Sequence, residues 1–220
     1  MRPESLRGFG PIGILAFLLI LAGNLLFAPL SALLVLAWAK LSDTPWRELG
    51  FSRPASWWRT VAIGLGLGVA LKLIMKAIVM PLLGAPPTNE AYQFLVGNAA
   101  ALPAMLYFVI IVAGFGEETL FRGYLFERLG KLFRPGIWSK ALIVFLTAAF
   151  FGIVHYPEQG MPGVEQALIV GLVFGAIFAF TRVLWILMVA HAAFDLTAVA
   201  IIYFGWERAV AEFFRTAPGS

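Results

Sequence analysis

Two adjacent glutamates and an arginine lie within an apolar part of this chain. The segment Gly114–Gly123 reads GFGEETLFRG and directly follows the apolar run Leu102–Ala113. An ionisable side chain near the centre of a bilayer costs roughly 2.5–3.5 kcal/mol on insertion scales. Such groups are usually paired or face a wet cavity, and they often mark a working site. Glu117, Glu118 and Arg122 are therefore the first candidates for chemistry.

Helix geometry separates the two glutamates. Glu118 and Arg122 are four residues apart, so on a helix they share a face and can pair. Glu117 points about 100° away from Glu118. We predict that Arg122 neutralises Glu118 and that Glu117 has no local partner. The alternative is a helix that leaves the membrane here and carries an ordinary surface ion pair.

The chain has two histidines, and both lie in or beside apolar runs. His155 ends the run Trp138–Tyr156, and His191 lies in Ile186–Asp195, four residues before Asp195. His191 and Asp195 can therefore share a helix face and hydrogen-bond. A lone membrane histidine is more often a satisfied interior residue than a catalyst. Here three apolar segments each carry ionisable groups, which could satisfy one another by converging on one buried polar site.

The chemistry expected of such a site is activation of water. A desolvated carboxylate beside a neutral imidazole can act as a general base, and a second imidazole can donate to a developing oxyanion. The chain has no cysteine, and no serine lies within residues 117–122, 151–155 or 191–195. This disfavours covalent catalysis and favours direct attack by water.

A zinc ion is the main alternative within the enzyme class. Glu117, His155 and His191 would make a His₂Glu ligand set with water in the open position. The compact zinc signature HExxH is absent from the sequence. A third use of buried Glu, His and Asp groups is a proton relay in a small transporter, although the chain lacks the paired interrupted helices of inverted repeats.

The composition indicates an integral membrane protein. Of the 220 residues, 61% are hydrophobic and 13% are charged, whereas soluble domains are about 45–50% apolar and about 25% charged. We expect one all-α domain over residues 1–220, a polytopic transmembrane bundle of about six to eight helices with a polar intramembrane cavity. The net charge of +4 comes from basic residues in a few loops, which indicates membrane topology and not nucleic-acid binding.

The first apolar run, Phe9–Ala39, is too long for a signal peptide. We expect a single tilted membrane helix, kinked near Pro29. A second span is expected over Val61–Leu83. The close helix contacts within it are assigned to three small residues, Gly64, Gly66 and Gly68.

Two lysines of the second span, Lys72 and Lys76, lie on one helix face. We interpret them as snorkelling or structurally paired side chains. Further along the chain, Glu158–Gly163 is predicted to be a short polar turn. The last two spans, Val164–Thr181 and Val183–Phe204, are expected to form a tight helical pair around Arg182.

Lysine and arginine are unevenly distributed. They crowd into residues 40–59 and 122–140 and are absent from 77–121 and 141–181. The positive-inside rule then predicts that both basic stretches are cytoplasmic and that the loop 84–100 is outside.

Three motifs, in order on apolar helices, carry a resemblance to a known family. They are Glu-Glu-x-x-x-Arg at 117–122, Phe-x-x-x-His at 151–155 and His-x-x-x-Asp at 191–195. Together with the stretch Trp46–Phe51, they resemble the CPBP family of CAAX-protease and bacteriocin-processing (Abi) membrane proteins. The likeness covers roughly residues 40–204.

The resemblance implies an intramembrane endopeptidase of the glutamate type in a prokaryotic cytoplasmic membrane. By position, Glu117 with His155 would activate the water, and His191 with Asp195 would support the oxyanion. Glu118 and Arg122 would have a structural and electrostatic role. The resemblance implies no cofactor. The implied partners are the lipid bilayer and a membrane-associated peptide or protein substrate, with a prenylated C-terminal peptide and a leader peptide both open.

Asp195 departs from the prenyl-endopeptidase pattern, which tends to have Asn at this position. An ionised Asp cannot donate to an oxyanion. We expect that Asp195 orients His191 and raises its basicity. The remaining functional alternative is a non-catalytic immunity or scaffold protein on the same bundle, because the same side chains would be present in both.

Overall fold

The computed structural model describes residues 2–214, and the described part of the chain is helical with no strand. Five helical stretches are long and apolar enough to cross a membrane, and two shorter apolar helices precede them. The prediction of a polytopic all-α bundle is therefore confirmed, and the chain is an integral membrane protein. Residue 1 and residues 215–220 of the predicted single domain lie outside the described residues.

The five spans follow one another through short connections. They are α4 (Trp57–Ile74) with η3 (Met75–Val79) and α5 (Met80–Leu82); α6 (Leu102–Tyr107) with η6 (Phe108–Glu117), η7 (Thr119–Leu125) and α7 (Phe126–Gly130); α8 (Ile137–Val154); α9 (Tyr156–Thr181); and α10 (Leu184–Tyr203). The remaining short helices are α1 (Pro3–Arg7), η1 (Gly23–Leu25), η2 (Trp46–Leu49), η4 (Glu90–Leu95), η5 (Ala99–Ala101) and α11 (Glu207–Ala211).

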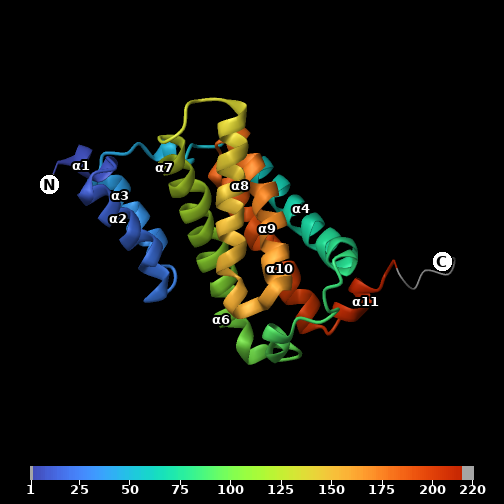
Figure 1. Cartoon of the computed structure of the whole chain (residues 1–220). Coiled ribbons are helices and arrows are strands. Elements are labelled where there is room, and N and C mark those ends of the chain that lie inside the picture. Colours follow the sequence, from blue (N-terminus) through green and yellow to red (C-terminus); the bar gives the residue numbers. More distant parts are fainter. Residues whose placement is uncertain (1, 215–220) are drawn as a thin grey trace.

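The predicted single first span is wrong, because the chain turns back on itself. Residues 11–41 form a hairpin of α2 (Pro11–Ala22) and α3 (Leu30–Leu41), which Figure 1 shows side by side at one edge of the bundle. Asn24 and Ser31 close the turn: each backbone N–H donates to the other's side-chain oxygen, at 3.0 and 2.9 Å. Each helix has 12 residues, about 18 Å in length, which is too short to cross a core of about 30 Å.

Small residues decide which spans pack together. α10 packs against α4, where a Cβ at Gly64 would meet Val189 and one at Gly68 would meet the Ala190 carbonyl. Gly66 has nothing within 4 Å of such a Cβ, so its predicted role in close contact is wrong. Gly64 and Gly68 are four residues apart and share the face that meets α10, whereas Gly66 points away.

The expected tight pair of the last two spans is also wrong. α9 packs along α8 instead, where a Cβ at Gly171 would lie 3.0 Å from Ala148. The predicted turn Glu158–Gly163 lies within α9, which is broken only at Gly160 (φ 61°, ψ −160°). α10 is thereby left free to pack against α4 and η6.

The span from α6 to α7 is continuous through its glycines. Its middle turns, η6 and η7, are π-helical, with wider i→i+5 turns that are rare and frequent at functional sites. A Cβ at Gly114 would lie 3.0 Å from Ala192 of α10, and one at Gly116 would lie 3.0 Å from Pro29 of the hairpin. The two glycines therefore let this span pack closely on both sides, just before Glu117.

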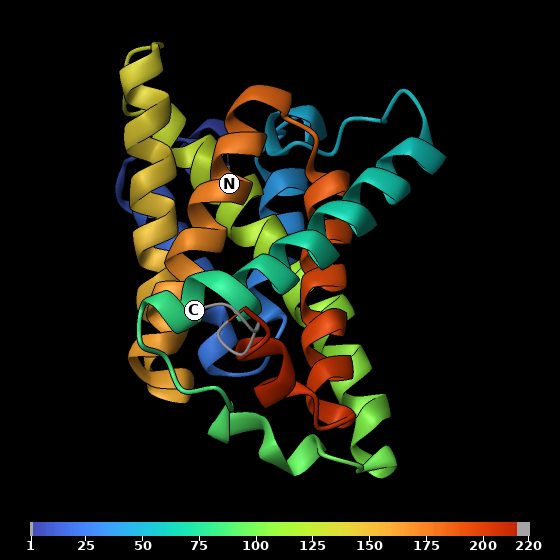
Figure 2. The ribbon, with the colours of Figure 1, turned by 90° about the vertical axis from the view of Figure 1, so that its right-hand side faces the viewer.

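The bundle has two distinct ends (Figures 1 and 2). α1, η2, α7 and the first turns of α4, α8 and α10 lie at one end, which we call the basic end. The start of α6, η4 and α11 lie at the other, which we call the open end. The site residues are carried by η6, α8 and α10 between them.

Candidate active site

A buried ion pair and a histidine form the centre of the site. Arg122 donates from Nη1 to Glu118 Oε1 at 2.8 Å, and both side chains are almost fully buried. The same Oε1 lies 2.7 Å from His191 Nδ1. Because a carboxylate only accepts, Nδ1 carries the proton and Nε2 is left to face the other acidic groups. The predicted Glu118–Arg122 pair is present.

Two further carboxylates flank His191 Nε2. Asp195 Oδ2 lies 3.6 Å from this nitrogen and Glu117 Oε2 lies 3.8 Å from it, both beyond normal hydrogen-bond length. Glu117 Oε2 is buried and has no hydrogen-bond partner. His191 is therefore oriented by Glu118, not by Asp195, which the sequence pattern favoured for that role.

His155 approaches from the end of α8. Its Nδ1 lies 2.7 Å from the Phe151 carbonyl oxygen, an acceptor, so Nδ1 donates and Nε2 of the neutral ring is free to accept. The Phe151 ring contacts His155 edge-on with 4.6 Å between centroids, and it contacts His191 at 5.9 Å. One aromatic side chain thus contacts both imidazoles.

All four candidate catalytic side chains line one cavity of about 420 Å³. Glu117, His155, His191 and Asp195 all belong to its wall. The three sequence segments therefore converge. The wall also includes Tyr92, where burial raises the phenol pKa above its ordinary value and keeps the group neutral.

Two lysines of α4 and its extension line the same cavity. Lys76 Nζ donates to Glu207 Oε1 at 2.8 Å, which is the structural pairing expected for this residue. Lys72 Nζ donates to Gln166 Oε1 at 3.1 Å and lies over the Phe194 ring, 4.6 Å from its centroid. The cavity therefore carries positive as well as negative groups.

The possible zinc ligands do not form a metal site. Within residues 2–214, no group of three or more His, Cys, Asp or Glu side chains is placed to hold a metal ion. The set of Glu117, His155 and His191 thus does not fit a metal, and we assign no chemical step to one.

Some contacts of the site could not be expected from the sequence. The Glu118–His191 bond joins residues 73 positions apart. The guanidinium of Arg122 lies between two rings, 4.7 Å from the Phe151 centroid and 5.6 Å from that of Phe174. Phe174 belongs to none of the three motifs, and only its place in an apolar run marks it as a core residue.

One protein family matches this part of the chain. Residues 99–197 match the family model described as type II CAAX prenyl endopeptidase Rce1-like. No curated protein and no solved structure matches the chain. The matched range contains all three motifs and the cavity residues of η6, α8 and the first half of α10. Residues 99–197 thus resemble the Rce1-like family of type II CAAX prenyl endopeptidases, a protease family, as the three motifs predicted.

Proposed function

We propose that the protein is a glutamate-type intramembrane endopeptidase of a prokaryotic cytoplasmic membrane, which hydrolyses membrane-associated peptides with water that Glu117 and His155 activate. The observation that carries this proposal is the free Glu117 Oε2, buried at the cavity wall without a hydrogen-bond partner. An unsatisfied buried carboxylate oxygen is costly in a purely structural role.

The first step is attack by water. A water molecule that donates one hydrogen bond to Glu117 and one to His155 Nε2 directs its lone pair at the peptide carbonyl carbon. Glu117 takes the proton as the new C–O bond forms. The carbonyl oxygen becomes an oxyanion, and His191 Nε2, protonated, donates to it.

The second step breaks the peptide bond. The oxyanion collapses to a carboxyl group, the C–N bond breaks, and Glu117 returns its proton to the leaving amine. Glu118 and Arg122 hold His191 in orientation through the bonds at 2.7 and 2.8 Å. Asp195, 3.6 Å from His191 Nε2, stabilises the protonated ring.

The test is cleavage of internally quenched peptides anchored in liposomes, some prenylated and some acylated, by the purified full-length protein. We expect cleavage by the wild type and by the control Tyr156→Phe, whose side chain is exposed. His155→Gln should lose at least a hundredfold in kcat, because general-base assistance is worth about 10²–10⁴.

The same assay separates the alternatives. An inactive wild type on every peptide would favour the scaffold or immunity protein. Activity that vanishes with a chelator and returns with Zn²⁺ would favour the zinc enzyme. Cleavage by His155→Gln at the wild-type rate would contradict the role given to His155.

A further inference from the structure

The cavity lies in one half of the bundle only. Its wall is built by the end of α4, η3, α5, η4 with the loop before it, α6 with η6, the end of α8, the first half of α9, α10 from His191 onward, and α11. These segments all lie between the middle of the bundle and the open end (Figures 1 and 2). No segment of the basic end contributes to this cavity.

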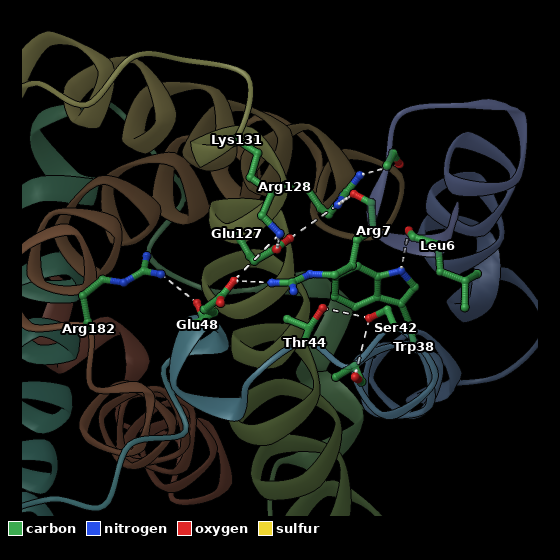
Figure 3. A network of polar contacts seen from close by, with 12 residues as sticks. Leu6, Arg7, Trp38, Ser42, Thr44, Glu48, Glu127, Arg128, Lys131 and Arg182 are labelled. Carbon is green, nitrogen blue, oxygen red and sulfur yellow. Dashed lines mark hydrogen bonds and ion pairs between the residues drawn. The ribbon is translucent and has the colours of Figure 1, made fainter. Parts of the chain in front are cut away.

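The basic end is closed by packed side chains and a polar network (Figure 3). Glu48 Oε2 accepts a hydrogen bond from Arg7 Nη2 at 2.9 Å and lies 3.8 Å from Lys131 Nζ. Lys131 also donates a hydrogen bond to Glu127. Arg128, 1% exposed, donates to the carbonyls of residues 7 and 8. This network ties α1, η2 and α7 together across that end.

An apolar layer lies between this network and the site. Leu49, Tyr124 and Leu184 are fully buried, and the Trp38 ring packs edge-on against Tyr124 with 4.9 Å between centroids. Trp38 Nε1 also donates to the Leu6 carbonyl, which fixes α1 over the end of α3. A peptide therefore has no path to Glu117 through the basic end.

Charge differs sharply between the two ends. The segments at the basic end and the loops that join them carry eleven Lys and Arg residues: Arg2, Arg7, Lys40, Arg47, Arg53, Arg59, Arg128, Lys131, Arg134, Lys140 and Arg182. Among residues 2–214 and outside the cavity, the segments at the open end carry one positive residue, Arg208 of α11. The lysine and arginine bias of short loops sets membrane orientation, with the richer side in the cytoplasm.

We propose that the site is loaded from the extracytoplasmic side of the membrane, so that its substrate is a peptide segment exposed on that side. Three observations support the proposal: the position of the cavity in one half of the bundle, the packed basic end, and the excess of Lys and Arg at that end. The statement about the substrate rests on the proposed function. A prenylated C-terminus of a cytoplasmic protein would not reach Glu117, whereas a membrane-anchored peptide on the outer surface would.

Orientation is tested by cysteine labelling, since the chain has no cysteine of its own. Single variants Ala55→Cys at the basic end, Ala100→Cys at the open end and Ala198→Cys in the cavity wall are expressed in cells. A sulfonated, membrane-impermeant maleimide is added outside before or after permeabilisation. We expect labelling of the 100 and 198 variants in intact cells and of the 55 variant only after permeabilisation.

Labelling of Ala55→Cys in intact cells, or of both ends alike, would overturn the orientation. Labelling at 100 without labelling at 198 would overturn the open path to the cavity. These readouts do not depend on catalysis, and Glu117→Gln in each background should leave them unchanged.

The substrate side is tested with two reporters, single-span proteins that carry the same cleavable segment next to the membrane, either outside or in the cytoplasm. We expect cleavage of the outside reporter only. Cleavage of the cytoplasmic reporter would contradict the proposal. If neither is cleaved while labelling is as expected, the proposed function fails and the orientation stands.

Discussion

At the residue scale, one imidazole is shared among three carboxylates. His191 bonds to Glu118 through Nδ1 and has Asp195 and Glu117 within 4 Å of Nε2. Arg122, which lies against two aromatic rings, offsets part of this negative charge. The adjacent glutamates consequently differ in kind: Glu118 is built into the packing, and Glu117 is left at the cavity.

This difference predicts opposite effects of the same substitution. Glu118→Gln leaves Arg122 as a buried charge without its partner, and breaking such a pair costs about 3–5 kcal/mol. Glu117→Gln removes a carboxylate that makes no hydrogen bond through Oε2, so the stability should hardly change. Denaturant unfolding in detergent micelles measures both. Equal losses of stability in the two variants would contradict the assignment.

Sequence reasoning succeeded here where spacing alone determines contact. The Glu118–Arg122 pair follows from the four-residue spacing on a helix, even though the turns are π-helical. The bond from Glu118 to His191 could not be derived, because it depends on how η6 packs against α10. Spacing suggested Asp195 as the partner of His191, and tertiary packing brought Glu118 closer.

At the element scale, glycines set the distance between the helices that carry the site. Gly68 packs against the backbone of Ala190, the residue before His191, and a Cβ there would lie 2.1 Å from the Ala190 carbonyl oxygen. The position of His191 on α10 therefore depends on the absence of a side chain at Gly68 of the neighbouring helix α4. Gly66 on the same helix has no such neighbour.

Gly68→Ala should displace α10 and lower both stability and activity. Overpacking costs about 1–3 kcal/mol, and the shift moves His191 and Asp195 away from Glu117. Gly66→Ala is the matched control and should behave as the wild type in thermal unfolding and peptide cleavage. An active, stable Gly68→Ala protein would show that α10 is not held by this contact.

Element boundaries were the least predictable feature. The apolar run of residues 9–39 has the composition of one long span, and Pro29 suggested a kink. The hairpin results from the mutual bonds of Asn24 and Ser31 and from α1 docking on Trp38, neither of which has a signature in hydropathy. The pairing of α9 with α8 likewise depends on which glycines face which helix.

At the scale of the whole molecule, Glu207 of α11 holds the loop 84–100, which forms part of the cavity wall. This carboxylate, 3% exposed, accepts from the Asn89 backbone, the Gln93 amide and Lys76 at 3.0, 2.7 and 2.8 Å. The sequence predicted for the loop 84–100 only that it lies on the outer side of the membrane. The fixation of this loop at the cavity wall by a residue more than 100 positions away was beyond sequence reasoning.

Glu207→Ala should loosen the loop 84–100. It removes the acceptor for three donors that come from the loop and from η3, so the loop separates from α11 more often. The measurement is the maleimide labelling rate of Ala198→Cys, which we expect to rise several-fold in the Glu207→Ala background. Glu90→Ala, at an exposed position of the same loop, is the control. An unchanged rate would mean that Glu207 does not hold the loop.

The central claim is that Glu117 is the base, and one comparison tests it most directly. Glu117→Gln and Glu158→Gln each remove one carboxylate from the same cavity wall, but Glu158 is exposed and makes no contact with His155 or His191 among the bonds described above. We predict that kcat for a membrane-anchored peptide falls by at least a hundredfold in Glu117→Gln and stays near the wild-type value in Glu158→Gln. Wild-type turnover by a folded Glu117→Gln protein would contradict the account.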